Sequence, residues 1–180
     1  MKLLSALLPA ALLSALGANA QYCSPSFANG CFGWQLMNIT LGSSMNWTNT
    51  DCSNGDQTAT VAVVDAGSSI SMTVEDGVWS GCSVWVDWDN SGSFEDAENL
   101  YHTYVGGDPS YTYNFSIDIP PGTPDGQYRM RVIGAWGSDG FTSGSENGFG
   151  PCGSFQYGSY DDFTLQVGTS TSIASLETSS

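Results

Sequence analysis

The stretch YTYNFSIDI, residues 111–119, decides the fold, and Pro120 and Pro121 follow it directly. Apolar side chains stand at every second position of this stretch, and polar side chains stand between them. Successive side chains of a strand point to opposite faces, so the alternation gives one apolar face and one wet face. Proline cannot continue the ladder of a central strand. The stretch therefore predicts a strand of an antiparallel sheet that buries one face.

Seven further runs show the same period of two, with turn residues between them at short intervals. They cover residues 36–41, 58–64, 70–75, 83–88, 100–105, 127–133 and 162–167. No helix is expected beyond a short turn within residues 95–98. About eight strands without helices indicate an all-β fold, an antiparallel β-sandwich or a jelly-roll-like arrangement.

The first twenty residues have the pattern of a secretory signal peptide. Lys2 supplies a positive charge, an apolar run covers residues 3–16, and Ala18-Asn19-Ala20 is a small-x-small cleavage site. The run is too short to span a membrane, and no later segment has about twenty apolar residues. We expect cleavage after Ala20 and a secreted or cell-surface chain without membrane insertion. One domain over residues 21–167 should precede a polar linker or disordered tail over residues 168–180.

The chain is strongly acidic, with 18 Asp and Glu against 3 Lys and Arg and a formal net charge of −15. Beyond the signal peptide, Arg129 and Arg131 are the only basic side chains. This charge disfavours nucleic acid and anionic membrane surfaces as partners. Cations, neutral glycans or a basic protein surface remain as partners, although an acidic surface also serves solubility alone.

Five cysteines occur in a chain that is expected to enter an oxidising compartment: Cys23, Cys31, Cys52, Cys82 and Cys152. Two disulfide bonds and one remaining thiol are expected. No CxxC pair is present, and His102 is the single histidine. A structural zinc site is therefore not expected.

The strongest chemical signal is DWDNSGSFEDAE, residues 87–98. Oxygen ligands fall at loop positions 1, 3, 5, 7, 9 and 12, with Gly92 at position 6, which is the pattern of a Ca²⁺ loop. The predicted ligands are Asp87, Asp89, Ser91, Ser93 through its peptide oxygen, Glu95 and Glu98. A strand precedes the loop, so the site is not a helix-loop-helix pair and the ion would be structural. The alternative is an ordinary acidic turn, in which the clustered carboxylates would repel one another.

Aromatic residues offer a possible binding surface. Four of the tryptophans lie near predicted strand ends or loops, where they could stack on sugars: Trp34, Trp47, Trp79 and Trp136. The alternative is that they belong to the sandwich core. Trp88, which alternates with Val84 and Val86, is expected in the core.

Arg129 and Arg131 share one face of their predicted strand. In so acidic a chain, ion pairs with Asp161 and Asp162 are more plausible than an anion-binding site. Burial of such a pair would not by itself make it stabilising.

Catalysis has little support in the sequence. His102 has no neighbouring motif of an activated nucleophile, and it is expected at the surface or at a strand edge. Glu95 and Glu98 could imitate the carboxylate pair of a glycosidase, but the metal loop explains their spacing better.

The chain resembles the GEVED domain of secreted and surface proteins from Bacteroidetes-type bacteria. The resemblance covers nearly all of residues 21–167. It is carried by YCSP at residues 22–25, VWVDWDNSGSFED at 84–96, RMRV at 129–132 and PCG at 151–153. The resemblance implies a disulfide between Cys23 and Cys152 that clamps the first and last strands, with Cys31 and Cys52 as the second pair. Cys82 is then the odd cysteine, either buried and inert or bridged to another chain.

The signature that names the family is altered. GSYDDFT at residues 158–164 stands where Gly-Glu-Val-Glu-Asp-Tyr-Thr is expected. Gly158, Asp162 and Thr164 match, Asp161 and Phe163 are conservative changes, and Ser159 replaces a carboxylate. A role of that first glutamate in metal or partner binding is not implied for this chain.

These observations predict a non-catalytic, extracellular module that Ca²⁺ stabilises and that binds a glycan or a cell-surface protein, for example in adhesion. A structural building block of a cell-surface assembly is the first alternative. A secreted hydrolase, or an accessory domain of one, is the second.

Overall fold

The computed structural model describes residues 22–52 and 55–168. The predicted signal peptide and all of the predicted tail except Gly168 lie outside this range. The strands are β1 (Ser26–Phe27), β2 (Leu36–Leu41), β3 (Met45–Thr48), β4 (Gly55–Val64), β5 (Ser69–Asp76), β6 (Ser80–Val86), β7 (Asn99–Thr103), β8 (Tyr111–Asp118), β9 (Gly126–Trp136), β10 (Ser154–Phe155) and β11 (Gly158–Val167). A single 3₁₀ turn, η1 (Asp96–Glu98), precedes β7.

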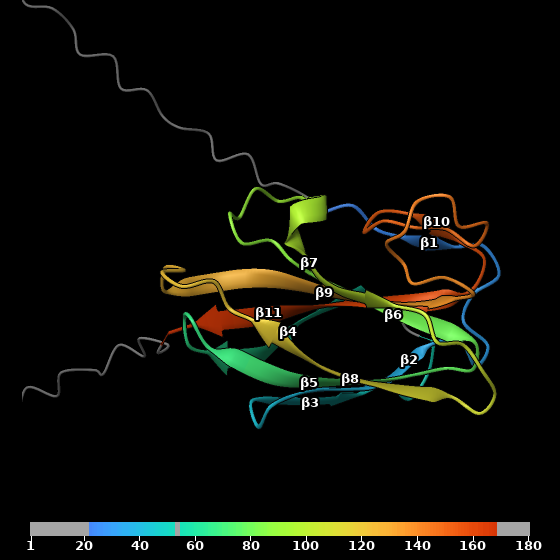
Figure 1. Ribbon diagram of the computed structural model, residues 1–180, viewed down its shortest axis with the longest axis horizontal. Coiled ribbons are helices and arrows are strands. Elements are labelled where there is room, and N and C mark those ends of the chain that lie inside the picture. Colours follow the sequence, from blue (N-terminus) through green and yellow to red (C-terminus); the bar gives the residue numbers. More distant parts are fainter. Residues whose placement is uncertain (1–21, 53–54, 169–180) are drawn as a thin grey trace, which may run out of the picture.

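Two sheets face each other, and a small strand pair lies outside them (Figure 1). The five-stranded sheet has the order β4-β11-β9-β6-β7, and the four-stranded sheet has the order β3-β2-β5-β8. The third sheet is the parallel pair β1-β10. The all-β sandwich that the alternation predicts is confirmed.

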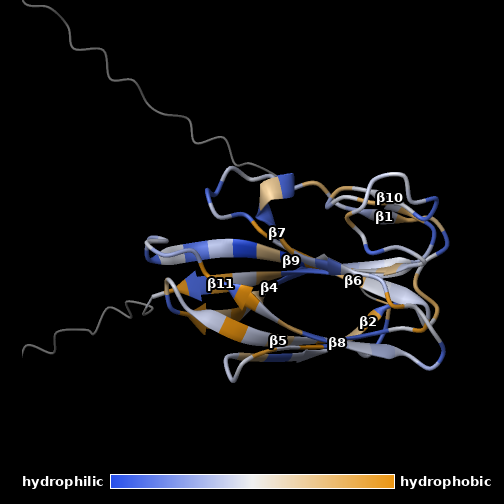
Figure 2. Ribbon diagram, in the orientation of Figure 1, coloured by the Kyte–Doolittle hydropathy of each residue, from blue (hydrophilic) through white to orange (hydrophobic). Residues whose placement is uncertain are grey.

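The main core fills the space between the two large sheets. The inner faces of β2 and β5 meet the inner faces of β4, β6, β9 and β11. Figure 2 shows strongly hydrophobic residues along the facing strands. In the deciding strand β8, Tyr113 and Ile117 are almost fully buried, and Ile119 just beyond it is buried too. Tyr111 at the start of β8 remains 41% exposed, so the apolar face is only partly covered there.

A second, smaller core lies on the outer face of the five-stranded sheet. Its buried members are Trp85, Phe94, Ile133, Ala135 and Phe155. Tyr22, Phe27, Phe141 and Tyr160 pack against it. The N-terminal segment and the β1-β10 pair thus form a partial third layer above this sheet (Figure 1).

The eight predicted strands all exist, with ends that shift by up to four residues. The five-stranded sheet is mixed, because β4 pairs with β11 in parallel while its other strands pair antiparallel. The alternation of side chains shows which face of the sheet each side chain takes, but it does not show whether two paired strands run parallel or antiparallel. The strands β1, β3 and β10 were not predicted, since runs of two to four residues are too short to show a period.

The two disulfide bonds that the resemblance implies are present: Cys23 joins Cys152, and Cys31 joins Cys52. Cys152 lies two residues before β10, so the first bond holds the small β1-β10 pair and not the last strand β11. Cys82 is a free, buried thiol within the described residues. Burial, with the nearby Asp76, raises the pKa of Cys82 well above its usual value, which disfavours the reactive thiolate.

Two disulfides are typical of proteins from an oxidising environment. None of the helices in the described ranges is long and apolar enough to cross a membrane.

Candidate metal site and its polar surroundings

The loop of residues 87–98 connects the central strand β6 with the edge strand β7. Asp87 follows β6 directly, and its backbone N–H still donates to the carbonyl oxygen of Arg129 at 3.0 Å. The first carboxylate of the loop therefore has a position fixed by the sheet. Asp87 is fully buried, and Glu98 at the other end of the loop is only 8% exposed.

The backbone of the loop turns around the Asp87 carboxylate. Asn90 and Gly92 adopt the left-handed region, with φ of 55° and 84°. This conformation directs the N–H groups of Ser91 and Gly92 to the two carboxylate oxygens of Asp87, at 3.0 and 2.9 Å. The glycine at position 6 is required because a side chain at this φ is strained.

Three carboxylates converge in the loop. One oxygen each from Asp87, Asp89 and Glu98 lies within 4.8 Å of the others. Two oxygens that bind the same Ca²⁺ at 2.3–2.6 Å lie at most about 5 Å apart. The cluster therefore has the size that a calcium ion requires.

The other predicted ligands lie around the same point. The hydroxyls of Ser91 and Ser93 are 3.0 Å apart, and the Ser91 hydroxyl lies 3.3 Å from the Ser93 peptide oxygen. Glu95 accepts a hydrogen bond of 2.6 Å from the Ser93 hydroxyl. All six residues that the spacing predicts are thus drawn together by one loop.

Glu98 closes the loop. Its carboxylate accepts hydrogen bonds from the backbone N–H of Trp88 at 2.7 Å and of Glu95 at 3.0 Å. The second bond belongs to the cap of η1. The short helical turn that the sequence allows within residues 95–98 is present as η1, and it brings Glu98 back toward Asp87.

No cationic side chain offsets these carboxylates. In the part of the chain that the structure describes, the arginines pair only with Asp56 and Asp162. The pKa of Glu98 is raised to about 7, chiefly by burial and also by Glu95 and Asp87, while hydrogen bonds from two backbone N–H groups oppose the shift. Hydrogen bonds from Ser91 lower the pKa of exposed Asp89. A buried, uncompensated carboxylate of this kind favours either a proton or a metal ion.

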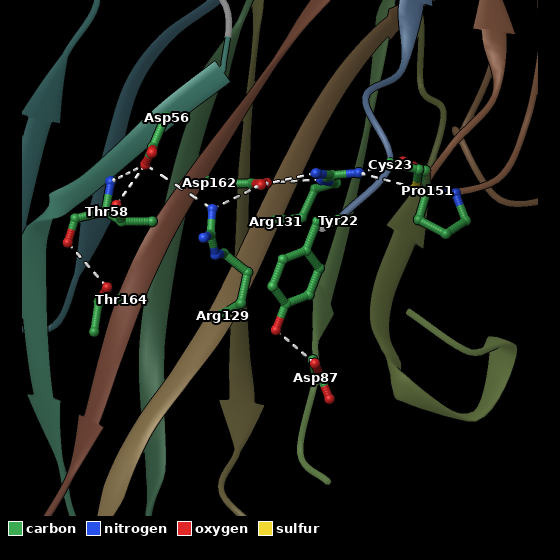
Figure 3. A network of polar contacts seen from close by, with 10 residues as sticks. All are labelled: Tyr22, Cys23, Asp56, Thr58, Asp87, Arg129, Arg131, Pro151, Asp162 and Thr164. Carbon is green, nitrogen blue, oxygen red and sulfur yellow. Dashed lines mark hydrogen bonds and ion pairs between the residues drawn. The ribbon is translucent and has the colours of Figure 1, made fainter. Parts of the chain in front are cut away.

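A network links the loop to the sheet (Figure 3). The Tyr22 hydroxyl donates a 2.6 Å hydrogen bond to Asp87, and this contact raises the pKa of the tyrosine, although burial of the ring contributes more. The Arg129 guanidinium lies 4.7 Å from the centre of the Tyr22 ring. Tyr22 was not predicted as a site residue, because it lies 65 residues before Asp87 in the sequence.

Arg131 and Asp162 form the centre of this network. The Arg131 Nε and Nη2 atoms each donate to one oxygen of Asp162 at 2.7 Å, and Nη1 donates to the Pro151 carbonyl oxygen at 2.7 Å. The guanidinium also lies 4.8 Å from the centre of the Phe94 ring, which packs in the second core and belongs to the candidate metal loop. The predicted ion pair with Asp162 is confirmed.

Residues 81–166 match the GEVED domain family. This part of the chain is a GEVED domain. No curated protein is similar enough to the chain to count as a relative. The GEVED match runs from β6 through β11 and includes the whole of the candidate metal loop.

The altered GEVED signature lies at the start of β11, where successive side chains take opposite faces. Asp162 points outward to the arginines, whereas Asp161 is buried and accepts a hydrogen bond from the Gln57 amide at 3.3 Å. The predicted pairing of Asp161 with an arginine was therefore wrong. The Ser159 hydroxyl, which replaces the first glutamate of the GEVED signature, accepts a hydrogen bond from the backbone N–H of Leu36 at 2.9 Å. Its role here is to join the two sheets.

The four tryptophans considered for sugar stacking have different surroundings. Trp47 packs edge-on against Phe163 of the main core. Trp34 and Trp136 contact each other and Tyr157 at one end of the sandwich. Trp79 is 49% exposed. The expectation that Trp88 packs on the main core is confirmed.

Proposed function

We propose that this chain is a non-catalytic, extracellular binding module whose GEVED domain is stabilised by one Ca²⁺ ion in the loop of residues 87–98. The observation that carries the proposal is the convergence of Asp87, Asp89 and Glu98 within 4.8 Å. Ser91, the Ser93 peptide oxygen and Glu95 would complete the set of oxygen ligands. Ca²⁺ suits such a set better than Mg²⁺, which keeps several waters and binds few protein ligands.

The ion would act as a structural staple. It would neutralise carboxylates that otherwise repel one another, and it would fix the crossing from β6 to β7. Phe94, inside the same loop, would then be held in the second core beneath the third layer. Extracellular calcium modules have dissociation constants on the order of 10⁻⁴ to 10⁻³ M.

Two disulfides and the predicted signal peptide support export. The surroundings of His102 support a non-catalytic role. Its Nδ1 atom lies 2.7 Å from the Asn99 side-chain oxygen, and its ring stacks on Phe141 with centroids 4.4 Å apart. Both contacts tie the imidazole to its neighbours, and the hydroxyl of Ser83, the cross-strand partner of His102, makes no hydrogen bond in the described part of the chain.

A thermal melt with and without Ca²⁺ tests the proposal. With free Ca²⁺ about tenfold above the dissociation constant, binding should stabilise the fold by about 1.4 kcal/mol. For a domain of this size the melting temperature should rise by about 3–6 °C. Asp89→Asn and Glu98→Gln should each remove this rise.

Asp96→Asn is the matched control, because Asp96 is an exposed carboxylate of the same loop at a position that is not a ligand. This variant should keep the full Ca²⁺ response. A wild-type melting temperature that does not change with Ca²⁺ contradicts the metal site. A response that Mg²⁺ reproduces in full contradicts the choice of metal.

A further inference from the structure

A polar cleft of about 320 Å³ lies beside the loop, on the outer face of the five-stranded sheet. Thr58, Thr164 and Arg129 line it from the neighbouring strands β4, β11 and β9. Tyr22 lines it from the N-terminal segment and Asn90 from the candidate metal loop. Along β9 the outer face changes from Ile133 and Ala135, which the third layer covers, to the polar side chains at the cleft.

The groups in the cleft suit a ligand that both donates and accepts hydrogen bonds. The Thr58 hydroxyl donates to Asp56, and the Thr164 hydroxyl donates to the Thr58 carbonyl oxygen, so both keep lone pairs for a donor. The carboxamides of Gln127 and Asn90, which also line the cleft, make no hydrogen bond to any residue that the structure describes. Each carboxamide offers an N–H₂ group and a carbonyl oxygen.

The charges favour a neutral ligand. Asp162, at 3.3 Å, and Asp56, at 3.9 Å, both pair with the Nη1 atom of Arg129. The arginine is therefore already neutralised, and the chain around it carries a net charge of −15. An anion would gain little from Arg129 and would meet repulsion elsewhere. A cation would find no carboxylate among the residues that line the cleft.

We propose that this cleft binds a neutral, hydroxyl-rich ligand, namely one or two sugar units at the end of a glycan. Every sugar hydroxyl is both donor and acceptor, which matches two carboxamides and two threonine hydroxyls. The half-buried Tyr22 ring forms part of one wall, where it packs against the Arg129 guanidinium. The volume is at the lower end of the range for small-molecule sites, so a terminal unit fits better than a long chain.

The same geometry makes the ligand depend on the metal, and this dependence rests on the proposed function. Asn90 belongs to the loop itself, and the Tyr22 hydroxyl holds Asp87, the first predicted calcium ligand. Two walls of the cleft are thus attached to the metal site. Ca²⁺ that orders the loop would also order these walls. The ligand would then bind more tightly, because the protein would lose less conformational entropy on binding it.

Amide NMR spectra of the ¹⁵N-labelled chain, titrated with a panel of neutral monosaccharides and disaccharides, test the proposal. At least one saccharide should cause saturable shifts at Gln127, Arg129 and Asn90. Gln127→Ala and Thr164→Val should each weaken the binding about three- to tenfold, as expected for one lost hydrogen bond. Trp79→Ala, at an exposed tryptophan that does not line the cleft, is the control and should bind as the wild type does.

Absence of saturable shifts with every neutral saccharide overturns the cleft proposal, even where Ca²⁺ raises the melting temperature. Binding that Trp79→Ala removes and Gln127→Ala keeps overturns it too. Tighter binding of glucuronate than of glucose overturns the neutral class. Equal affinity in Ca²⁺ and in EGTA overturns the link to the metal, and a melting temperature unaffected by Ca²⁺ overturns the proposed function by a separate measurement.

Discussion

Asp161 and Asp162 are neighbours in β11 and carry the same side chain, yet the two faces of the sheet give them opposite chemistry. Asp162 lies on the outer face, where two arginines surround it. Asp161 lies on the inner face, where Gln57 donates one hydrogen bond and the Oδ2 atom has no partner in the described ranges. Burial raises the pKa of Asp161 to about 8, and the Asp162 charge adds to this shift. We therefore expect Asp161 to hold its proton in the folded protein at neutral pH.

Asp161→Asn should stabilise the protein relative to the wild type, increasingly so as the pH rises from about 4 to about 8. In the unfolded chain Asp161 ionises near its ordinary pKa of 3.8, whereas the folded protein keeps the proton until about pH 8. The wild type thus loses stability across this window, and asparagine, which cannot ionise, does not. The difference should reach on the order of 1–3 kcal/mol at pH 8.

Urea denaturation of both proteins at several pH values, with Ca²⁺ at saturation throughout, measures this difference. Asp118→Asn changes an exposed carboxylate at the end of β8 and serves as the control. The control should give a difference from the wild type that hardly varies with pH. A pH-independent difference for Asp161→Asn would mean that the buried carboxyl does not hold its proton.

At the scale of elements, the hydrogen bonds of one buried arginine attach the outer layer to the five-stranded sheet, and aromatic rings surround them. Arg131 of β9 is 1% exposed, and it bonds to Asp162 of β11 and to the carbonyl oxygen of Pro151, which precedes β10. The rings of Phe94 and Tyr160 lie within 4.9 Å of its guanidinium. The flat, forked guanidinium matches the carboxylate with two parallel bonds, which lysine cannot do.

Arg131→Met should destabilise the protein by about 3–5 kcal/mol, because it leaves Asp162 buried without its bidentate partner. Arg129→Met is the matched control. The Arg129 side chain is 26% exposed and reaches Asp162 through a single 3.3 Å contact, so its loss should cost about 1 kcal/mol or less. Chemical denaturation gives both values. Equal losses for the two variants would show that the Arg131 pair has no special role in holding the outer layer.

The sequence predicted the individual strands and the loop better than it predicted which segments contact one another. The period of two located eight strands, and the spacing of residues 87–98 identified six side chains that the loop brings together. Both signals are local, since each depends on residues within one strand or one turn. The parallel pairing of β4 with β11 and the contact of Tyr22 with Asp87 join segments far apart in the chain. Neither leaves a periodic pattern, so the third layer and the cleft could not be predicted.

At the scale of the whole molecule, residues before the GEVED match supply most of the four-stranded sheet and one edge strand of the five-stranded sheet. The matched residues 81–166 supply four strands of the five-stranded sheet but only β8 of the four-stranded one. The strands β2, β3 and β5 cover the inner core, and β4 adds an edge to β11. Residues before the match also supply Tyr22, which contacts the metal loop. The candidate site therefore depends on both parts of the chain.

The Cys23–Cys152 disulfide fixes this dependence covalently, and its removal should affect both stability and Ca²⁺ binding. It spans 129 residues, whereas Cys31–Cys52 spans 21. Loop-closure entropy gives the long bond about 5 kcal/mol and the short one about 3 kcal/mol. Urea denaturation of Cys23→Ser/Cys152→Ser and Cys31→Ser/Cys52→Ser should reproduce that order.

Calcium titration of the same two variants separates a local effect from a global one. Cys23 adjoins Tyr22, whose hydroxyl holds the Asp87 carboxylate, so freeing Cys23 should weaken Ca²⁺ binding severalfold while the protein is still folded. The Cys31–Cys52 bond joins two segments that supply none of the predicted ligands, so the second variant should bind Ca²⁺ as the wild type does. Equal weakening in both would mean that general loss of stability, and not the position of Tyr22, controls the metal site. The unequal result would show that the N-terminal segment is part of the calcium site and also a wall of the cleft beside it.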